Sequence, residues 1–223
     1  MIDFAFSKMV IALLLFSLVS VYAIEIKKHE VLYPGGQLKE RYEFYLDENK
    51  HEVRQGLSEE FFPNGSKKGE INWQGGKENG LVLYFFSEGR KSYEANYKAG
   101  KKNGYATVWY ANGQKQWQTV FKVGLTHGVW REWYQDGKKK FEANYSEGKL
   151  DGLATWWHDN GKLWQERSFQ SGQLVKGTVH EWDKAGKQTF PPLENSSFTS
   201  SSSLDSGKRD SNFVKPDMPA AGF

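Results

Sequence analysis

A pattern that returns every 24 residues is the feature that most limits how this 223-residue chain can fold. Each copy contains one glycine that ends a short turn sequence such as Ala-Asn-Gly: Gly36, Gly65, Gly89, Gly113, Gly137, Gly161 and Gly186. The last six of these turn glycines are separated by 24, 24, 24, 24 and 25 residues. Self-similarity at a fixed period indicates a repeat array, in which each unit packs mainly against its neighbours.

Two aromatic columns accompany the turn glycines. The first column stands four residues before each glycine: Leu32, Phe61, Phe85, Trp109, Trp133, Trp157 and Trp182. The second column stands eight residues after it: Phe44, Trp73, Tyr97, Phe121, Tyr145 and Phe169. Strand residues rich in aromatics on both sides of a glycine turn are typical of β-hairpins. The pattern therefore predicts a strand, a turn and a second strand in each copy.

The turn sequences favour a three-residue loop, a type I turn closed by a left-handed glycine. Pro34 and Pro63 fit the second position of such a turn, whereas a two-residue loop would place them at a paired strand position without an amide donor. With this loop, we expect residues at even distances from the glycine to share one face on both strands. That face would hold both columns as the structural core, with Gly113, Gly137 and Gly161 at the turns; around Gly113 and Gly137 it would also hold Tyr105, Thr119, Val129 and Ala143.

A second glycine cluster closes each copy, as in Gly148-Lys149-Leu150-Asp151-Gly152, and predicts a turn that leads into the next hairpin. Ordering a hairpin costs about 1–2 kcal/mol per residue, more than burial of a few aromatics returns, so neighbouring hairpins must pack together. We therefore expect a mainly β fold, an elongated single-sheet array of antiparallel hairpins with six to seven copies over residues 31–190. The copies at the two ends depart from the pattern and are interpreted as caps.

Residues at odd distances from the glycine would form the opposite face, which we predict to be the partner-binding face. Its candidate contact residues are Tyr84, Phe86, Tyr110, Trp130, Tyr134, Trp156 and Trp164. Tyrosine and tryptophan are enriched at contact surfaces. Two alternatives remain open, namely ordinary cross-strand packing on a partly solvated face and stacking of the tryptophans on sugar rings. Glu70, Glu94, Glu142 and Glu166 recur by repeat and are expected to pair with lysines.

The sequence carries no pattern that indicates an active site. It has no cysteine, its formal net charge is +3, and its five histidines do not cluster. The absence of cysteine excludes disulfides and thiolate metal sites, and the balanced charge argues against a nucleic-acid binder. A repeat multiplies one surface, whereas an active site needs converging, dissimilar groups. We expect no catalytic residue, no metal, no cofactor and no small-molecule substrate.

The two ends differ from the repeats. Residues 9–21 are uncharged and apolar, which predicts a signal peptide over residues 1–23 and export to the periplasm or beyond; an uncleaved anchor helix is the alternative. Residues 24–30 would be a lead-in. Residues 191–223 are rich in serine and predict a disordered tail.

The motifs Trp109-Tyr110-Ala111-Asn112-Gly113 and Trp133-Tyr134-Gln135-Asp136-Gly137, with the glycine cluster at 148–152, resemble MORN repeats. They are most similar to the bacterial variant catalogued as a YwqK-type antitoxin of toxin–antitoxin pairs. The resemblance implies hairpin repeats in a shallow sheet that contacts proteins or membrane surfaces. We expect an exported, non-enzymatic scaffold that binds such a partner; glycan binding and an antitoxin role are the alternatives.

Overall fold

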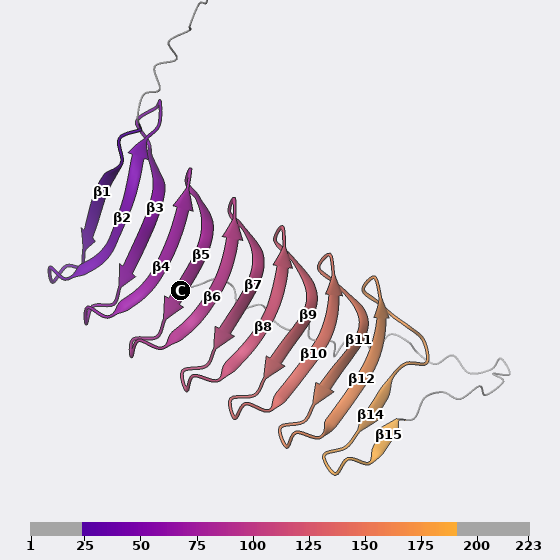
Figure 1. Ribbon diagram of the computed structural model, residues 1–223. Helices are drawn as coiled ribbons and strands as arrows, with labels where there is room; N and C mark the ends of the chain where they lie inside the picture. Colours follow the sequence, from indigo (N-terminus) through magenta and orange to yellow (C-terminus); the bar gives the residue numbers. More distant parts are fainter. Residues whose placement is uncertain (1–23, 191–223) are drawn as a thin grey trace, which may run out of the picture.

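A computed structural model describes residues 24–190 and shows an all-β protein without helices in that range (Figure 1). The signal peptide predicted at residues 1–23 and the tail predicted at residues 191–223 lie outside the described residues. The first strand begins at Lys27, within the predicted lead-in.

The described residues form fifteen strands. The first seven are β1 (Lys27–Leu32), β2 (Leu38–Leu46), β3 (Glu52–Phe61), β4 (Lys67–Gln74), β5 (Lys77–Phe85), β6 (Lys91–Lys98) and β7 (Lys101–Trp109). The next five are β8 (Lys115–Lys122), β9 (Leu125–Trp133), β10 (Lys139–Ser146), β11 (Lys149–Trp157) and β12 (Leu163–Gln170). The last three are short: β13 (Gln173–Leu174), β14 (His180–Trp182) and β15 (Gln188–Phe190).

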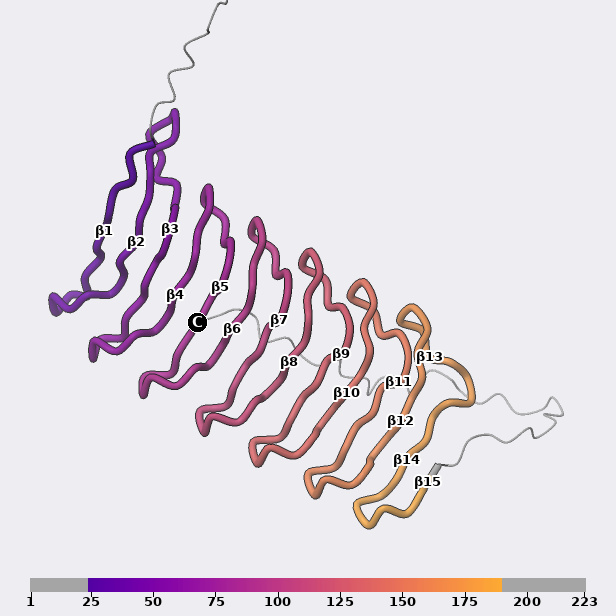
Figure 2. The backbone as a smooth tube through the Cα atoms, viewed as in Figure 1, coloured from indigo at the N-terminus to yellow at the C-terminus, as the bar shows by residue number. Residues whose placement is uncertain are grey.

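All of these strands belong to one antiparallel sheet. They pair in chain order from β1 to β12, after which β14 and β15 continue the sheet and β13 pairs with the end of β12. Figures 1 and 2 show the result, a long row of bent hairpins in a single layer. The predicted fold class, an elongated single-sheet array of antiparallel hairpins, is confirmed.

The turn at each turn glycine is the predicted three-residue loop. At the third of the 24-residue copies, the Tyr110 amide donates to the Gln114 carbonyl at 2.8 Å, and the Gly113 amide donates to the Tyr110 carbonyl at 2.9 Å. Gly113 has φ +88°, in the left-handed region that favours glycine. The same two hydrogen bonds recur at all seven turn glycines.

The second turn in each repeat is a two-residue loop, as in Ala99-Gly100 between the paired residues Lys98 and Lys101. Both loop residues have positive φ, 50° and 79°, which is the type I′ geometry. The predicted chain reversal at the second glycine cluster is confirmed. The Gly100 amide also donates to the Glu78 carbonyl of the previous repeat at 2.9 Å, so this edge of the sheet is tied from one repeat to the next.

The prediction that both aromatic columns share a face is wrong, because each hairpin contains a β-bulge. Trp109 pairs with Lys115, but the preceding residue Val108 pairs with Trp117, so that Gln116 is an extra residue in β8. One extra residue reverses the alternation of side chains in the rest of the strand. Odd positions before the glycine therefore share a face with even positions after it.

We call the face that carries Val108 and Trp117 the inner face and the opposite one the outer face. The second column lies on the inner face, where Phe121, Tyr145 and Phe169 are buried and Trp73 and Tyr97 are half-buried. The first column, with Trp109, Trp133 and Trp157, lies on the outer face, as do Tyr105 and Val129. These residues are therefore not part of the core predicted for them.

The core lies along the inner face and consists of rings that alternate with small residues. Ala95 and Ala154 are 0% exposed and Phe141 is 2% exposed. The rings of Trp117 and Trp130 stack with their centroids 4.9 Å apart and their planes at 20°. Because the stacked rings come from neighbouring repeats, their burial joins adjacent hairpins, as a linear array requires.

Candidate functional site

All seven residues predicted to bind a partner lie on the inner face or at its bulge. Trp130 is only 3% exposed and forms part of the core. Trp156 is half-buried and packs against Phe141 at a centroid distance of 4.9 Å, and Tyr84 packs against Tyr93 at 6.0 Å. Phe86, Tyr110 and Tyr134 are half-buried near the turns, and Trp164 is 45% exposed. Contact with a partner stays a prediction for these residues, but Trp130 offers almost no surface for it.

The tyrosines that precede the turns connect the repeats. The Tyr110 hydroxyl donates to the Trp133 carbonyl at 2.9 Å, and the Tyr33 hydroxyl donates to the Phe61 carbonyl at 2.8 Å. In the repeat of Gly161, Nε2 of His158 lies 2.9 Å from the Trp182 carbonyl oxygen, so the imidazole takes the place of a phenol. Burial raises the pKa of the Tyr110 hydroxyl, which keeps it protonated as a donor. We call these contacts the tyrosine staples.

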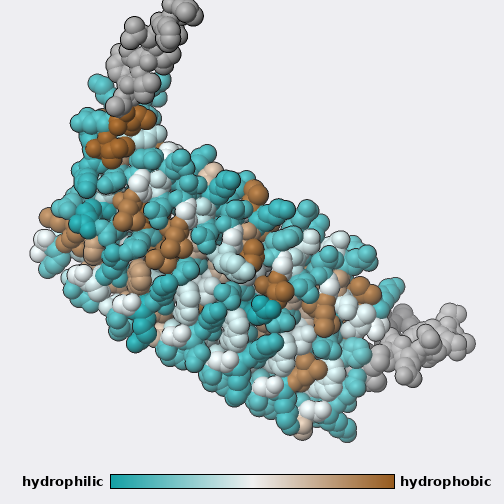
Figure 3. Space-filling model, viewed as in Figure 1, coloured by the Kyte–Doolittle hydropathy of each residue, from teal (hydrophilic) through white to brown (hydrophobic). Residues whose placement is uncertain are grey.

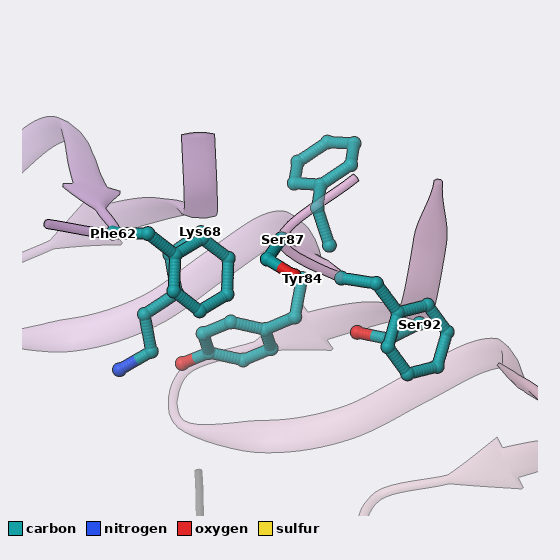
Figure 4. A pocket seen from close by; sticks show the side chains of 7 residues that line it. Phe62, Lys68, Tyr84, Ser87 and Ser92 are labelled. Carbon is teal, nitrogen blue, oxygen red and sulfur yellow. The ribbon is translucent and has the colours of Figure 1, made fainter. Parts of the chain in front are cut away.

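The staples are interrupted at Phe62 and Phe86, which carry no hydroxyl. There, between the second and third hairpins, the structure has a pocket of about 350 Å³ (Figure 4). Its lining residues are Phe62, Lys68, Tyr84, Phe85, Phe86, Ser87 and Ser92. In Figure 4 the Tyr84 ring lies between the side chains of Lys68 and Ser92. Burial raises the pKa of the Tyr84 hydroxyl to about 12, as expected for a phenol against an apolar wall.

Ser92, one of the lining residues, is shorter than its counterparts in the other repeats. The same bulge position, three residues after the turn glycine, holds larger side chains in the other 24-residue copies: Lys68, Gln116, Lys140 and Trp164. Lys140 pairs with Glu132 at 3.3 Å, and Lys68 pairs with Glu60 at the same distance. A serine reaches no such partner, so the space beside Phe86 stays open.

The outer face carries a charged band. Glu59 accepts from Lys67 Nζ at 2.8 Å and from Arg41 Nε at 3.0 Å. These hydrogen bonds, that of Lys67 first, lower the pKa of the Glu59 carboxyl. The predicted pairing of the recurrent glutamates is confirmed for Glu70 with Lys67, for Glu94 with Lys91, and for Glu142 with Lys139.

Cations cover the first aromatic column on this face. Lys139 Nζ lies 5.2 Å from the Trp157 ring centroid, and Lys115 Nζ lies 5.9 Å from that of Trp133. These cation–π contacts leave the indoles half-buried under lysine side chains. The covered rings are poor platforms for a ligand.

Exposed apolar side chains form a separate row on the outer face, eight residues before each turn glycine. Leu57 is 40% exposed, Leu81 37%, Tyr105 65% and Leu153 46%, and Val129 is half-buried. We call these five residues the outer row. Figure 3 shows apolar side chains recurring along the length of the molecule. The periodicity of the outer row is visible in the sequence, but its facing depends on the bulge, which places Tyr105 and Val129 on the outer face and not in the predicted core.

Residues 24–190 contain neither a metal-binding cluster nor a helix that could span a membrane. No group of three or more histidine, aspartate or glutamate side chains is arranged to hold a metal ion there.

The comparisons with known proteins agree with this geometry. A family model described as "MORN repeat variant" matches residues 54–74, 126–147 and 150–171. Each matched range covers most of one hairpin, formed by β3–β4, β9–β10 and β11–β12 respectively. The search of curated proteins found no match for the chain. Three hairpin copies of this chain thus match the MORN repeat variant, the repeat class that the sequence motifs indicate.

Proposed function

We propose that the chain is a non-enzymatic repeat scaffold that binds a protein partner along the outer row. The observation that carries this proposal is the exposure of Leu57, Leu81, Tyr105 and Leu153 on the face opposite to the core. These residues are 37–65% exposed, yet an apolar residue recurs at this position in five consecutive repeats. Exposed apolar residues that line up over several elements are typical of interaction sites.

The dimensions of the row suit an extended partner. Neighbouring strands lie about 4.8 Å apart, so two strands per repeat place successive members of the row about 10 Å apart. Four such steps separate Leu57 from Leu153, which gives about 40 Å. Asn72 pairs with Leu57, Asn96 with Leu81, and Asn144 with Val129, so an amide side chain lies beside three of the five members of the row. This mixture of apolar and amide groups matches protein interfaces, which combine both.

The proposal includes export of the chain. The uncharged apolar stretch at residues 9–21 supports a signal peptide, and the partner would then lie in the periplasm or outside the cell. Export also supports a scaffold role over an antitoxin role, because an antitoxin of the usual kind meets its toxin in the cytoplasm. Fractionation with an antibody against the chain tests this part: intact protein with Met1 in the cytosol would contradict it.

The binding test uses the full chain and a substitution set on the outer row. Proteins captured from the envelope fraction are identified by mass spectrometry, and binding of the purified partner is measured by calorimetry. We expect the triple variant Leu81→Asn, Tyr105→Asn, Leu153→Asn to bind at least tenfold more weakly while its circular dichroism and melting temperature stay unchanged.

The matched control replaces two apolar residues at the edge formed by the second turns, Val123→Asn and Leu125→Asn, which are 61% and 52% exposed. It should bind as the wild type does. Equal affinity of the outer-row variant and the wild type would overturn the proposed surface. Binding on a glycan array that disappears in Trp164→Ala would instead support the glycan alternative.

A further inference from the structure

We infer that the pocket beside Phe86 receives the tryptophan or tyrosine ring of a protein that contacts the inner face. The pocket lies on the inner face, opposite the outer row, so this inference goes beyond the proposed function and does not depend on it. The pocket departs from the regular repeat at three residues, with Ser92 in place of a long side chain and Phe62 and Phe86 in place of tyrosines. All three residues line the pocket of about 350 Å³.

Another repeat of the chain shows which side chain can pack beside the residue three positions before the turn glycine. In the repeat of Gly161, the Trp164 indole lies against the His158 ring with a centroid distance of 5.8 Å and an interplanar angle of 31°. Trp164 stands three residues after its turn glycine and His158 three residues before it. Ser92 and Phe86 occupy these two positions around Gly89. The space that Ser92 leaves open beside Phe86 therefore corresponds to the space that an indole fills at His158.

The lining favours an aromatic ring over an aliphatic group. Phe62, Tyr84 and Phe86 contribute aromatic side chains to the lining, and aromatic pairs gain energy from edge-to-face and offset contacts beyond the burial of area. Lys68 adds a cation at the rim, held by Glu60 at 3.3 Å, which can approach the face of a bound ring.

The interrupted staple favours a ring with a hydrogen-bond donor. In the regular repeats a phenol donates to the carbonyl of the first-column residue in the next repeat, as Tyr110 does to Trp133. Phe62 has no hydroxyl to offer the corresponding carbonyl of Phe85. An indole N–H or a phenol from a protein on the inner face can supply that donor, so tryptophan and tyrosine fit better than phenylalanine.

The test uses indole as the probe and the full chain, with binding followed by ¹H–¹⁵N NMR. We expect saturable shifts confined to the amides of Phe62, Lys68, Phe86 and Ser92 and of their sequence neighbours. Cyclohexanol at the same concentrations, a probe of similar size without an aromatic ring, should give shifts at least fivefold smaller. Indole shifts of equal size at the equivalent residues Tyr110 and Gln116 of the next repeat would overturn the inference.

Two variants test the role of the short side chain. Ser92→Trp introduces the tryptophan that the equivalent position carries at Trp164, and its indole should fill the pocket. Ser92→Gln introduces the glutamine that the equivalent position carries at Gln116. Both should fold, because other repeats carry these residues at this position, and both should lose the indole shifts. Gln118→Ala on the outer face is the control and should retain them. Wild-type indole affinity in a folded Ser92→Gln variant would overturn the inference.

These measurements separate the two proposals. Indole binding does not need the partner, so its absence contradicts the pocket assignment even where the outer-row test succeeds. Failure of the outer-row test with intact indole binding contradicts the proposed function and leaves the pocket as a site for an aromatic group.

Discussion

The hydroxyl of Tyr134 donates a 2.7 Å hydrogen bond to the main-chain carbonyl of Trp157, 23 residues further along the chain. The two residues belong to neighbouring repeats, and the bond lies next to the turns on one edge of the sheet. Tyr110 and Tyr33 make the same contact with the repeats that follow them. In a linear array much of the stability resides in such interfaces between neighbours.

Removal of one staple should therefore destabilise the chain without altering its fold. We expect Tyr134→Phe to lower the free energy of unfolding by about 1 kcal/mol, the net value of a typical intramolecular hydrogen bond. Urea denaturation followed by circular dichroism measures it. Phe62→Tyr is the converse change, since it offers a hydroxyl to the Phe85 carbonyl, and it should stabilise by a similar amount. Equal stability of Tyr134→Phe and the wild type would contradict the role given to the staples.

Gly69 is required because the Tyr84 ring lies against its backbone. A β-carbon at Gly69 would stand 2.8 Å from both Cδ1 and Cε1 of that ring, closer than real contacts allow. We expect Gly69→Ala to destabilise by about 1–3 kcal/mol, the usual range for overpacking. Thermal unfolding of Gly69→Ala, Tyr84→Ala and the double variant forms a cycle that isolates the contact. If Gly69→Ala lowers stability as much in the Tyr84→Ala background as in the wild type, the loss does not come from contact with the Tyr84 ring.

Val123 stands at a strained position of a type I′ turn. Its φ is +52°, and the following Gly124 has φ +85°. A β-branched residue in this region costs about 1–3 kcal/mol, and asparagine is favoured there. Val123→Asn should therefore raise the free energy of unfolding by about 1 kcal/mol or more. Ala99→Asn, at a similar φ of +50° but without β-branching, is the comparison and should gain less. A lower free energy of unfolding in Val123→Asn would contradict the claim that the backbone of Val123 is strained.

Acid should weaken the charged band on the outer face. Because the pKa of Glu59 is lowered in the folded protein by the hydrogen bonds from Lys67 and Arg41, the ionised carboxylate favours the folded state. This contribution is present above the pKa of the unfolded chain and is lost as the pH falls through the folded pKa. Glu59→Gln should therefore be less stable than the wild type at pH 7, and the difference should shrink below about pH 4. Chemical denaturation at a series of pH values measures it; a difference that grows in acid would contradict this sign.

Much of this architecture could be predicted from the sequence because its signals are local. The Asn-Gly type of turn, the position of Pro34 and Pro63, and the 24-residue period each depend only on neighbouring residues. They were sufficient for the three-residue loop, the second turn and the single sheet. The pairing of glutamates with lysines also followed from their spacing.

The face of the sheet on which each aromatic column lies could not be predicted, because the bulge has no compositional signature. Its extra residue is Lys68, Ser92, Gln116, Lys140 or Trp164 in successive repeats, so neither size nor charge nor polarity marks it. A one-residue error in pairing then moves every later side chain to the other face. The staples were missed because they depend on the distance between repeats. The pocket left its traces in the comparison of the repeats, namely the short Ser92 at the bulge position and the phenylalanines Phe62 and Phe86 in place of tyrosines.

The tyrosine staples have a consequence for how such a chain changes over generations. Because each unit is joined to the next by the same few bonds, a duplication or deletion of a whole 24-residue segment creates a junction like those already present. The molecule would become about 10 Å longer or shorter, and every remaining unit would keep its surroundings. Length can therefore be selected in steps to fit a partner, while a one-residue change inside a strand would move the side chains that follow in that strand to the other face.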